Sequence, residues 1–592
     1  MTTTQAPKPV SKIIVAVHGI GDQIANATVQ SLAFRLFDYY GKPPALPLGR
    51  FHVTGKTSPG ATGKTCPCET RKTSPGVVLL KSPPDPDAEL PAPIGFMEVY
   101  WADIPRGLVD KGFTLEDAKR WARTIVARLH IKSSQAEQLD SRQYRMLEAV
   151  LDELVDAVYV FDNICFLARH VGLFKFELKK VLDDFLNDVQ IVTEFEEYRG
   201  TILDRFDEVM QIIANDPKTK DAEIYIVGHS EGSVVSFFGL LRAMSQDSMP
   251  SWVDQVRGLM TIGSPIEVHL LLWADLWKFK SPQALRAPIV WWNYLDHGDP
   301  IAYDLEKTRQ WMSESGWSRC FSLGTQEKPH EAAFARYLLP GKAHIDYWQD
   351  RELFAHFIEN VVELPPPEGK TSTEKAGLPD DRWYAAPIAT VFPYLLVGVL
   401  MFLSVYALYT PVANDLEATL TSFETFRNLS AFTLLMAGMT AAVRIPRLTE
   451  KKYWWFAAAA FLLAAFGAAP FIIAPVTRVF IGGILGSEFV LPGLALAATI
   501  VATVWSYKRP ARGVWPLLVP GFVLAVGLAL RALSTSKPEW PIVVGSIFFL
   551  YVWWLATLLF DLSFVWHSYV RWSTALQAMR RMIRDPAQRK EV

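Results

Sequence analysis

Cysteine is scarce in this sequence, with only four among 592 residues. So few cysteines in so long a chain argue against a fold held together by disulfides. Cys66 and Cys68 stand close together in a Cys-Pro-Cys sequence, but no second cysteine pair follows to complete a zinc site. We therefore expect free thiols and no bound metal.

The sequence also lacks an excess of charge of either sign. Its 59 Lys and Arg residues are nearly balanced by 61 Asp and Glu residues, and no basic domain indicates a nucleic-acid partner. A phosphate-binding loop is missing as well, because the segment GATGKT at 60–65 lacks the four residues that must separate glycine from Gly-Lys-Thr. We therefore expect neither nucleic acid nor a nucleotide cofactor.

The first residues of the sequence contain no apolar stretch, so we expect no cleaved secretory signal, whereas long apolar runs are concentrated in the last third of the chain. The N-terminal sequence MTTTQAPKPVSK is polar, unlike a secretory signal. After the Pro-rich segment 363–382, which is typical of a linker, six apolar segments approach the length of a membrane span: they lie near 385–409, 429–443, 453–475, 489–507, 514–532 and 541–565. We expect a catalytic-type domain at 1–362, a transmembrane domain of about six helices at 383–570 and a basic tail at 571–592.

Basic residues are distributed unevenly among the segments that join these apolar runs. Lys and Arg gather after the second run, after the fourth run and in the tail, whereas the other connecting segments contain few. Basic connections are preferentially retained in the cytoplasm. The pattern predicts an integral protein of a bacterial-type inner or plasma membrane, with the N-terminal domain and both termini on the cytoplasmic side.

Strand and helix patterns alternate over the first 362 residues. Short apolar runs typical of buried strands lie at 12–19, 94–103, 222–228, 257–263 and 288–295, and residues 26–40 have a helical pattern. This alternation predicts an α/β fold, with a mostly parallel sheet and helices on both faces.

Two segments interrupt this alternation. Residues 42–93 are rich in Pro, Gly, Thr and Lys, which is typical of a surface loop. Residues 107–215 are mostly helical in pattern and carry apolar patches. This helical insertion either forms a cap over an active site or consists of helices that only pack against the domain.

A serine lies between two glycines where a predicted strand meets a predicted helix, in the sequence Gly228-His229-Ser230-Glu231-Gly232. In a nucleophile elbow of this kind, the glycines relieve crowding at a sharp turn and the serine Oγ is exposed. The helix that begins at Glu231 directs its positive end toward the serine, which favours a developing oxyanion. Ser230 is therefore the candidate nucleophile.

A serine hydroxyl needs a general base, and the base needs an acid to orient it. In elbow-type hydrolases the acid and then the histidine follow the serine along the chain. Asp299, just past a predicted strand, is the candidate acid, and Asp296 is the fallback. His344 is the candidate base because it lies in a predicted loop before an amphipathic helix; His330 is a weaker candidate, and His356 is expected to be structural.

Backbone N–H groups near the serine are needed to bind an oxyanion. Glu231, the residue after the serine, would supply one of them. The other is expected from Gly19 or Ile20, which follow His18 at the end of the first predicted strand. The side chain of His18 is expected to orient this loop rather than to act as the base.

The first 360 residues resemble the α/β-hydrolases of the lipase and esterase group. The matching pieces are Val17-His18-Gly19, Gly228 to Gly232, Ile262-Gly263-Ser264-Pro265, Asp299-Pro300 and His344. The resemblance implies an α/β-hydrolase fold and ester hydrolysis through an acyl-enzyme. Glu231 departs from the pattern, because many lipases have a small or apolar residue at that position. A hydrolase domain followed by several membrane spans is also similar to the membrane-bound deacylases that act on lipid anchors.

These features together predict a membrane-integrated serine hydrolase that cleaves lipid carboxylic esters, as a lipase or phospholipase does. Its expected partners are the lipid bilayer and a membrane lipid or other acyl-ester substrate, and no cofactor is expected. Two alternatives stay open. One is a thioesterase or protein deacylase with the same triad, and the other is a catalytically inactive hydrolase-like membrane scaffold or sensor.

Overall fold

The chain divides into two compact units in the computed structural model. The first comprises residues 1–114, 181–389 and 574–592, and the second comprises residues 115–180 and 390–573. The structure describes residues 10–20, 23–41, 77–79, 94–105, 192–299, 301–325, 328–337, 340–367, 375–415 and 540–568, together with positions 124, 189, 429, 433, 525–526, 529 and 532–533.

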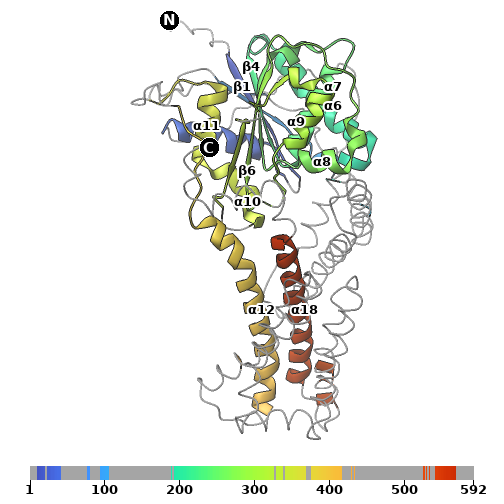
Figure 1. The fold of residues 1–592 in the computed structure, drawn as a ribbon, viewed down its shortest axis with the longest axis vertical. Helices are drawn as coiled ribbons and strands as arrows, with labels where there is room; N and C mark the ends of the chain where they lie inside the picture. The colour runs from blue at the N-terminus through green and yellow to red at the C-terminus, as the bar shows by residue number, and fades with distance from the viewer. Residues whose placement is uncertain are drawn as a thin grey trace, which may run out of the picture. The chain divides into compact units, whose positions relative to one another are not determined.

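The first unit is built on a mostly parallel sheet (Figure 1). Its described strands run in the order β2-β3-β1-β4-β5-β6-β7, and β8 pairs with β6. Every pair is parallel except β2 with β3. The strands are β1 (Lys12–Val17), β2 (Val77–Leu79), β3 (Ile94–Val99), β4 (Glu223–His229), β5 (Val256–Ile262), β6 (Ile289–Asp296), β7 (Phe321–Ser322) and β8 (Glu331–Phe334).

Continuous apolar runs place these strands in the interior of the domain. β1 buries every residue after Lys12, and β4 buries every residue after Glu223. A parallel strand can be apolar at every position because helices cover both of its faces. The register pairs Val17 of β1 with Gly228 of β4, so the C-terminal ends of these two strands lie side by side.

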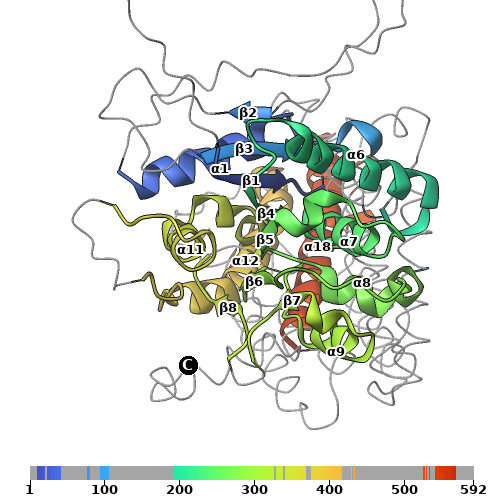
Figure 2. The same cartoon turned by 90° about the horizontal axis from the view of Figure 1, so that it is seen from above.

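Helices cover both faces of the sheet. Figure 2 shows α1 and α11 on one face and α6, α7, α8 and α9 on the other. The helices of this unit are α1 (Ala27–Tyr39), α6 (Glu196–Asn215), α7 (Glu231–Met244), α8 (Ile266–Leu272), α9 (Glu306–Glu314), α10 (Pro340–Asp346) and α11 (Arg351–Phe357).

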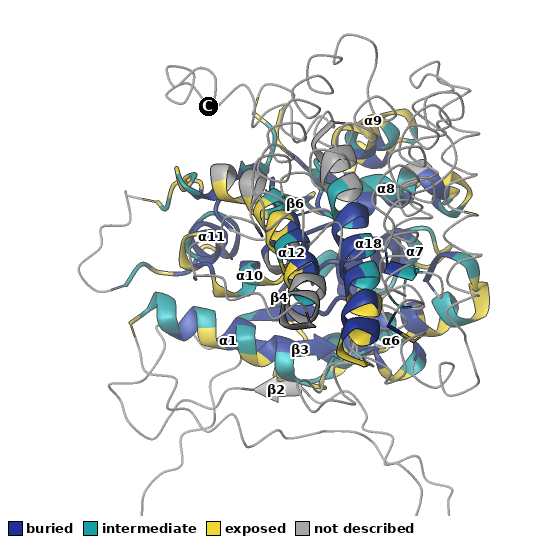
Figure 3. Cartoon of the chain, turned by 90° about the horizontal axis from the view of Figure 1, so that it is seen from below, coloured by how far each residue is buried: buried dark blue, intermediate teal, exposed yellow. Residues whose placement is uncertain are grey.

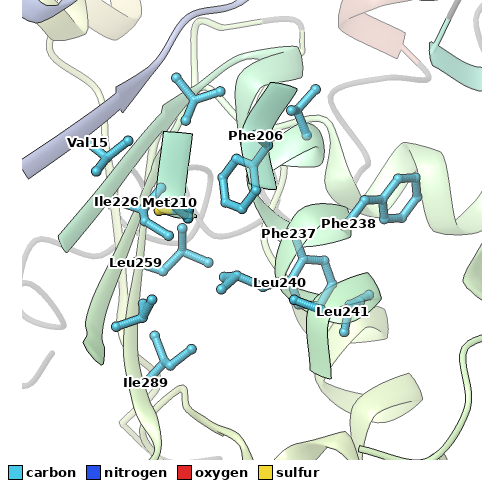
Figure 4. Packing of buried hydrophobic residues seen from close by; sticks show 14 of the residues in the cluster. Val15, Phe206, Met210, Ile226, Phe237, Phe238, Leu240, Leu241, Leu259 and Ile289 are labelled. Atoms are coloured by element: carbon cyan, nitrogen blue, oxygen red, sulfur yellow. The ribbon is translucent and has the colours of Figure 1, made fainter. Parts of the chain in front are cut away.

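Apolar clusters join the sheet to the helices on each face. The larger cluster contains Phe206 and Met210 of α6, Phe237 of α7 and the strand residues Ile226 and Leu259 (Figure 4). A second cluster contains buried residues of α1 and α11 on the opposite face. Burial of one such side chain contributes about 1.5–3 kcal/mol relative to exposure, so these two clusters stabilise the sheet from both sides.

A strand residue provides the N-terminal cap of α1. Asn26, the residue before the helix, has a positive φ of 70° and makes no side-chain cap. The buried carboxylate of Glu98 on β3 instead accepts hydrogen bonds from the N–H groups of Asn26 and Thr28. A carboxylate is favourable at this end of a helix because of the helix dipole, and the contact ties α1 to the sheet.

The predicted α/β fold is confirmed. The expected strands form as β1, β3, β4, β5 and β6, and the expected helix at 26–40 forms as α1. β2, β7 and β8 were not predicted; they have three, two and four residues and depend on pairing with a longer neighbour. α6 confirms a helix at the end of the predicted insertion 107–215. Most of that insertion and of the loop 42–93 lies outside the described residues.

The segment that precedes α12 (Ala385–Asp415) is held against the first unit. The N–H of Arg382 donates to the carbonyl of Ala335 at 2.9 Å. The buried side chain of Arg336 donates to the carbonyl of Asp380. Hydrogen bonds to the domain therefore hold the last residues of the predicted linker 363–382.

The second unit contains most of α12 and the long helix α18 (Trp540–Ser568). Val397, Met401 and Val405 of α12 share one buried cluster with residues of α18. Their spacing of four residues marks one face of a helix.

The two helices of this pair run antiparallel. The ring of Tyr394, near the start of α12, lies 6.2 Å from the ring of Phe560, toward the end of α18. Figure 1 shows the same arrangement, because the start of α12 and the end of α18 lie at the same end of the pair. The end of α12 therefore lies on the side of the pair from which α18 begins.

Apolar side chains also face outward from this pair. Among the described residues, Trp540–Phe560 is the one stretch long and apolar enough to cross a membrane, and Phe392–Ala407 is a shorter apolar helix. Leu395, Val399 and Val544 are exposed, as the colouring of α12 and α18 in Figure 3 illustrates. The first and last of the six predicted spans are thus helices, and the other four lie wholly or largely outside the described residues.

Candidate active site

Ser230 occupies a sharp corner between β4 and α7. It is the single residue between the end of β4 at His229 and the start of α7 at Glu231, with φ 54° and ψ −131°. A positive φ is uncommon for a residue with a side chain and costs on the order of 1–3 kcal/mol. The conformation is maintained by hydrogen bonds, since Ser230 N–H donates to Ile262 O at 3.0 Å and Ser233 Oγ donates to Ser230 O at 2.6 Å.

Close backbone approaches around this corner require glycine. A Cβ atom on Gly232 would lie 2.3 Å from the carbonyl oxygens of Val17 and His18, and one on Gly19 would lie 2.7 Å from Ser230 Cβ. The loop after β1 therefore packs directly on the serine. Ser230 is only 2 % exposed, so the expectation of an exposed hydroxyl was wrong, because this loop covers the corner.

Asp299 and His344 are brought together by the fold. His344 Nδ1 lies 2.9 Å from Asp299 Oδ2, and a carboxylate can only accept, so Nδ1 carries the proton. His344 Nε2 is buried and has no hydrogen-bond partner among the described residues. A neutral imidazole in this tautomer has its lone pair on Nε2, which is what a general base requires.

His344 does not lie in a loop, as the sequence had suggested, but in the short helix α10. Pro340 is its first residue, and proline suits the first turn of a helix because that N–H has no helical partner. The chain then continues through a 3₁₀ turn at Tyr347–Gln349. The candidate base therefore lies on a short helix.

Tyr347 holds the carboxylate of Asp299 in place, and the sequence analysis did not predict this contact. Its hydroxyl donates to Asp299 Oδ2 at 2.9 Å and accepts from the N–H of Asp296 at 2.8 Å. Ile301 N–H donates to Asp299 Oδ1 at 2.9 Å. Tyr347 follows His344 by three residues, a spacing that puts two side chains on one side of a helix. This spacing is a signal that the sequence contains.

Asp296, the fallback acid, has a different environment. Its carboxylate accepts from the N–H groups of Gly298 at 2.7 Å, Arg336 at 2.7 Å and Tyr337 at 3.1 Å. Burial raises the pKa of Asp296 to about 7. The structure thus pairs His344 with Asp299, while Asp296 fixes the backbone after β8.

His229 connects the serine corner to the helix that carries His344. Its Nε2 lies 2.7 Å from the backbone oxygen of His344, and a carbonyl accepts, so Nε2–H donates. The two imidazole rings are 4.8 Å apart. Burial lowers the pKa of His229 to about 3, so the ring remains neutral at ordinary pH and the hydrogen bond persists.

The loop of His18 and Gly19 is held by Trp101. Trp101 N–H donates to His18 Nε2 at 3.0 Å, so the proton is on Nδ1, which donates to Gly19 O at 2.7 Å. Trp101 Nε1–H also donates to His18 O at 3.0 Å. Because a trans peptide directs C=O and N–H oppositely, these bonds fix the N–H direction of Ile20. Of the candidate oxyanion donors, Glu231 follows Ser230 in the chain and Gly19 packs against the serine.

The other two candidate histidines make structural contacts. His330 Nδ1 donates to Ser322 O at 3.1 Å, and its ring stacks on Trp292. His356 Nδ1 is hydrogen-bonded to Tyr294 Oη at 2.8 Å, and burial lowers the pKa of His356 to about 4. Neither residue is hydrogen-bonded to Asp299 in the described part of the chain.

The described residues contain no cluster of three or more His, Cys, Asp or Glu side chains that could hold a metal ion.

Comparison with known proteins returns no matching family model, no matching curated protein and no matching solved structure.

Proposed function

We propose that the chain is a serine hydrolase of the α/β-hydrolase type that cleaves lipid carboxylic esters at a membrane surface. The observation that carries the proposal is a serine at a positive-φ strand-to-helix corner, tied through His229 to a histidine that a buried aspartate orients. A serine that served only to form a turn would not require this combination of backbone corner, histidine and oriented aspartate–histidine pair.

The order of the strands supports the hydrolase type. β1 lies between β3 and β4, followed by β5 and β6, with the antiparallel β2 at one edge. The serine follows β4, the aspartate follows β6 and the histidine follows β8. This is the order of nucleophile, acid and base along the chain that elbow-type hydrolases share.

In the proposed first half-reaction, His344 Nε2 removes the hydroxyl proton of Ser230 as Oγ attacks the ester carbonyl carbon. The N–H groups of Glu231 and of Gly19 or Ile20, with the positive end of α7, stabilise the oxyanion that forms. The ester C–O bond then breaks, and His344 gives its proton to the departing alcohol. An acyl group remains on Ser230.

In the second half-reaction, water replaces the alcohol. His344 removes a proton from water as its oxygen attacks the acyl carbon, and the proton returns to Ser230 Oγ when the fatty acid leaves. Asp299 keeps Nδ1–H directed toward itself through both halves and stabilises the imidazolium. Tyr347 and Ile301 hold the carboxylate in that role.

The apolar helices support a lipid substrate. The 21 residues Trp540–Phe560 would span about 31 Å at the rise of an α-helix, the thickness of a bilayer core. The exposed side chains of α12 and α18 are apolar, as a lipid-facing surface requires. Anchoring would hold the site close to a high concentration of acyl esters.

The test is covalent labelling of the detergent-purified full chain with a fluorophosphonate probe, with Ser230→Ala as the matched control. We expect the native chain to label and the variant not to label. We also expect the variant to lose ester hydrolysis down to a residual rate roughly 10³–10⁴ above water. Products released from a total lipid extract would identify the bond that is cleaved.

Three outcomes would contradict the proposal. Near-native turnover in Ser230→Ala would show that another group is the nucleophile. An unlabelled native chain that releases nothing from any acyl ester would instead support a non-catalytic scaffold. Preference for thioesters over oxygen esters would redirect the assignment to a thioesterase or deacylase.

A further inference from the structure

A buried pair of side chains, Glu231 and His269, lies beside Ser230 and has no part in the steps above. Glu231 opens α7 directly after the serine, and His269 lies on α8. Glu231 Oε2 lies 3.1 Å from His269 Nε2, and each side chain is only 2 % exposed. Water therefore does not solvate this contact.

Within the described residues, the other side-chain polar atom of each partner makes no hydrogen bond. Glu231 Oε1 and His269 Nδ1 are both buried without a hydrogen bond to any described residue. A buried carboxylate is costly unless a neighbouring group compensates it. Within the described part of the chain, His269 is the side chain that can do so.

His269 also contacts a tryptophan on the segment that follows its helix. Its ring packs on Trp273 with 5.1 Å between centroids, and Trp273 Nε1–H donates to Glu194 Oε1 at 2.8 Å. Trp273 follows α8, and Glu194 lies just before α6. Contacts from two parts of the chain thus fix the orientation of the imidazole.

An uncompensated carboxylate on Glu231 would oppose catalysis at the serine. The N–H of Glu231 is one of the proposed oxyanion donors, and the positive end of α7 stabilises negative charge at this position. The carboxylate of Glu231 would be a second negative charge at this helix end, and it would compete with the substrate oxyanion for the positive end of α7. It also repels an oxyanion strongly, because the interior screens charge poorly.

We propose that His269 is a positioning residue that acts on the nucleophile corner through Glu231. Its hydrogen bond fixes the carboxylate and compensates the charge, so that an oxyanion can form on the substrate bound to Ser230. This inference rests on the serine-hydrolase function proposed above. It accounts for a glutamate at a position where the lipase-like pattern has a small or apolar residue.

A double-mutant cycle on the detergent-solubilised full chain tests this role. The variants are Glu231→Gln, His269→Gln and the two together, with His269→Asn as a second replacement if the first does not fold. The measurements are kcat and KM for a p-nitrophenyl ester, the rate of fluorophosphonate labelling and the melting temperature.

We expect His269→Gln to lower kcat and the labelling rate by about 10- to 100-fold at nearly unchanged KM, because the lost effect is felt in the transition state. In the Glu231→Gln background, the same replacement should change kcat by less than about twofold, since no charge is left to compensate.

Two results would overturn the role of His269 while leaving the proposed function intact. One is an equal loss of kcat in both backgrounds. The other is non-additivity of the two replacements in the melting temperature but not in kcat, which would show that the pair stabilises the fold without affecting catalysis. A native chain that neither hydrolyses the ester nor labels would overturn the proposed function, and the inference with it.

Discussion

Two aspartates, three positions apart in the chain, show how neighbours decide the role of a residue. Asp299 shares one carboxylate oxygen between His344 and Tyr347, so it can orient an imidazole. Asp296 uses its carboxylate on backbone N–H groups, and burial raises its pKa to about 7. One carboxylate is therefore placed to support a base, and the other to support the backbone.

This difference predicts unequal effects of removing each charge. Asp299→Asn should lower kcat by about 10⁴, because the amide would favour the wrong tautomer of His344. Asp296→Asn should mainly lower the melting temperature and keep kcat within about tenfold of native, since the orienting bond to His344 persists. Steady-state kinetics and thermal unfolding of both variants provide the check. A mild effect at Asp299 with a severe one at Asp296 would reverse the assignment.

His229 tests whether a single donated hydrogen bond positions the base. His229→Leu removes the donor to the His344 carbonyl, and we expect kcat to fall about 10-fold or more with little change in KM. His229→Gln offers an amide N–H near the position of Nε2 and should recover most of that loss. Equal activity of the two variants would show that ring packing, rather than the hydrogen bond, is what matters at this position.

At the scale of elements, the candidate site depends on how strand ends are joined to helices. β4 stops at His229 and α7 starts at Glu231, which leaves one strained residue between them. The loop after β1 reaches that residue because β1 and β4 pair in register. The corner is therefore formed by the two parallel strands β1 and β4 and the helix α7. Packing of their apolar faces stabilises it.

The cap of α1 by Glu98 is the contact at this scale that can be tested alone. Glu98→Ala leaves the N–H groups of Asn26 and Thr28 without an acceptor and should reduce the free energy of unfolding by about 1–3 kcal/mol. Glu98→Gln keeps one acceptor oxygen and should lose less. Denaturant unfolding measures both variants. Equal stability of native and alanine proteins would mean that the carboxylate does not cap α1.

At the scale of the whole molecule, the antiparallel packing of α12 and α18 constrains the topology in a membrane. If both helices span, the number of spans from the first to the last must be even, because the chain returns to its starting side. The six apolar segments satisfy this condition. The tail after α18 would then lie on the same side as the domain that precedes α12.

Cysteine labelling tests this topology in intact cells. Ser536→Cys and Asn414→Cys should both react with an impermeant thiol reagent added outside, because these positions join spans on the side poor in Lys and Arg. Thr449→Cys, in a basic segment, should not react, and the native cysteines serve as an unlabelled control.

Labelling of Ser536→Cys and Asn414→Cys from opposite sides would contradict an even number of spans. Labelling of Thr449→Cys alone would place the candidate active site on the outer face.

The sequence by itself determined the features that depend on local order. Predominantly apolar runs predicted the central strands, because a parallel strand covered by helices on both faces can be apolar at nearly every position. Gly228, Gly232 and the strand-to-helix switch around Ser230 predicted the corner for the same local reason. The apolar stretches at 385–409 and 541–565 likewise predicted the helices α12 and α18.

Only the tertiary structure decided which distant groups meet. Asp299 rather than Asp296 faces His344, and Tyr347 and His229 complete that arrangement, because strand pairing and helix packing set these directions. His269 lies 38 residues beyond Glu231 in the chain, and no periodicity links them. Contacts of this kind follow from three-dimensional packing, whereas sequence patterns report only the neighbours along one strand or one turn of helix.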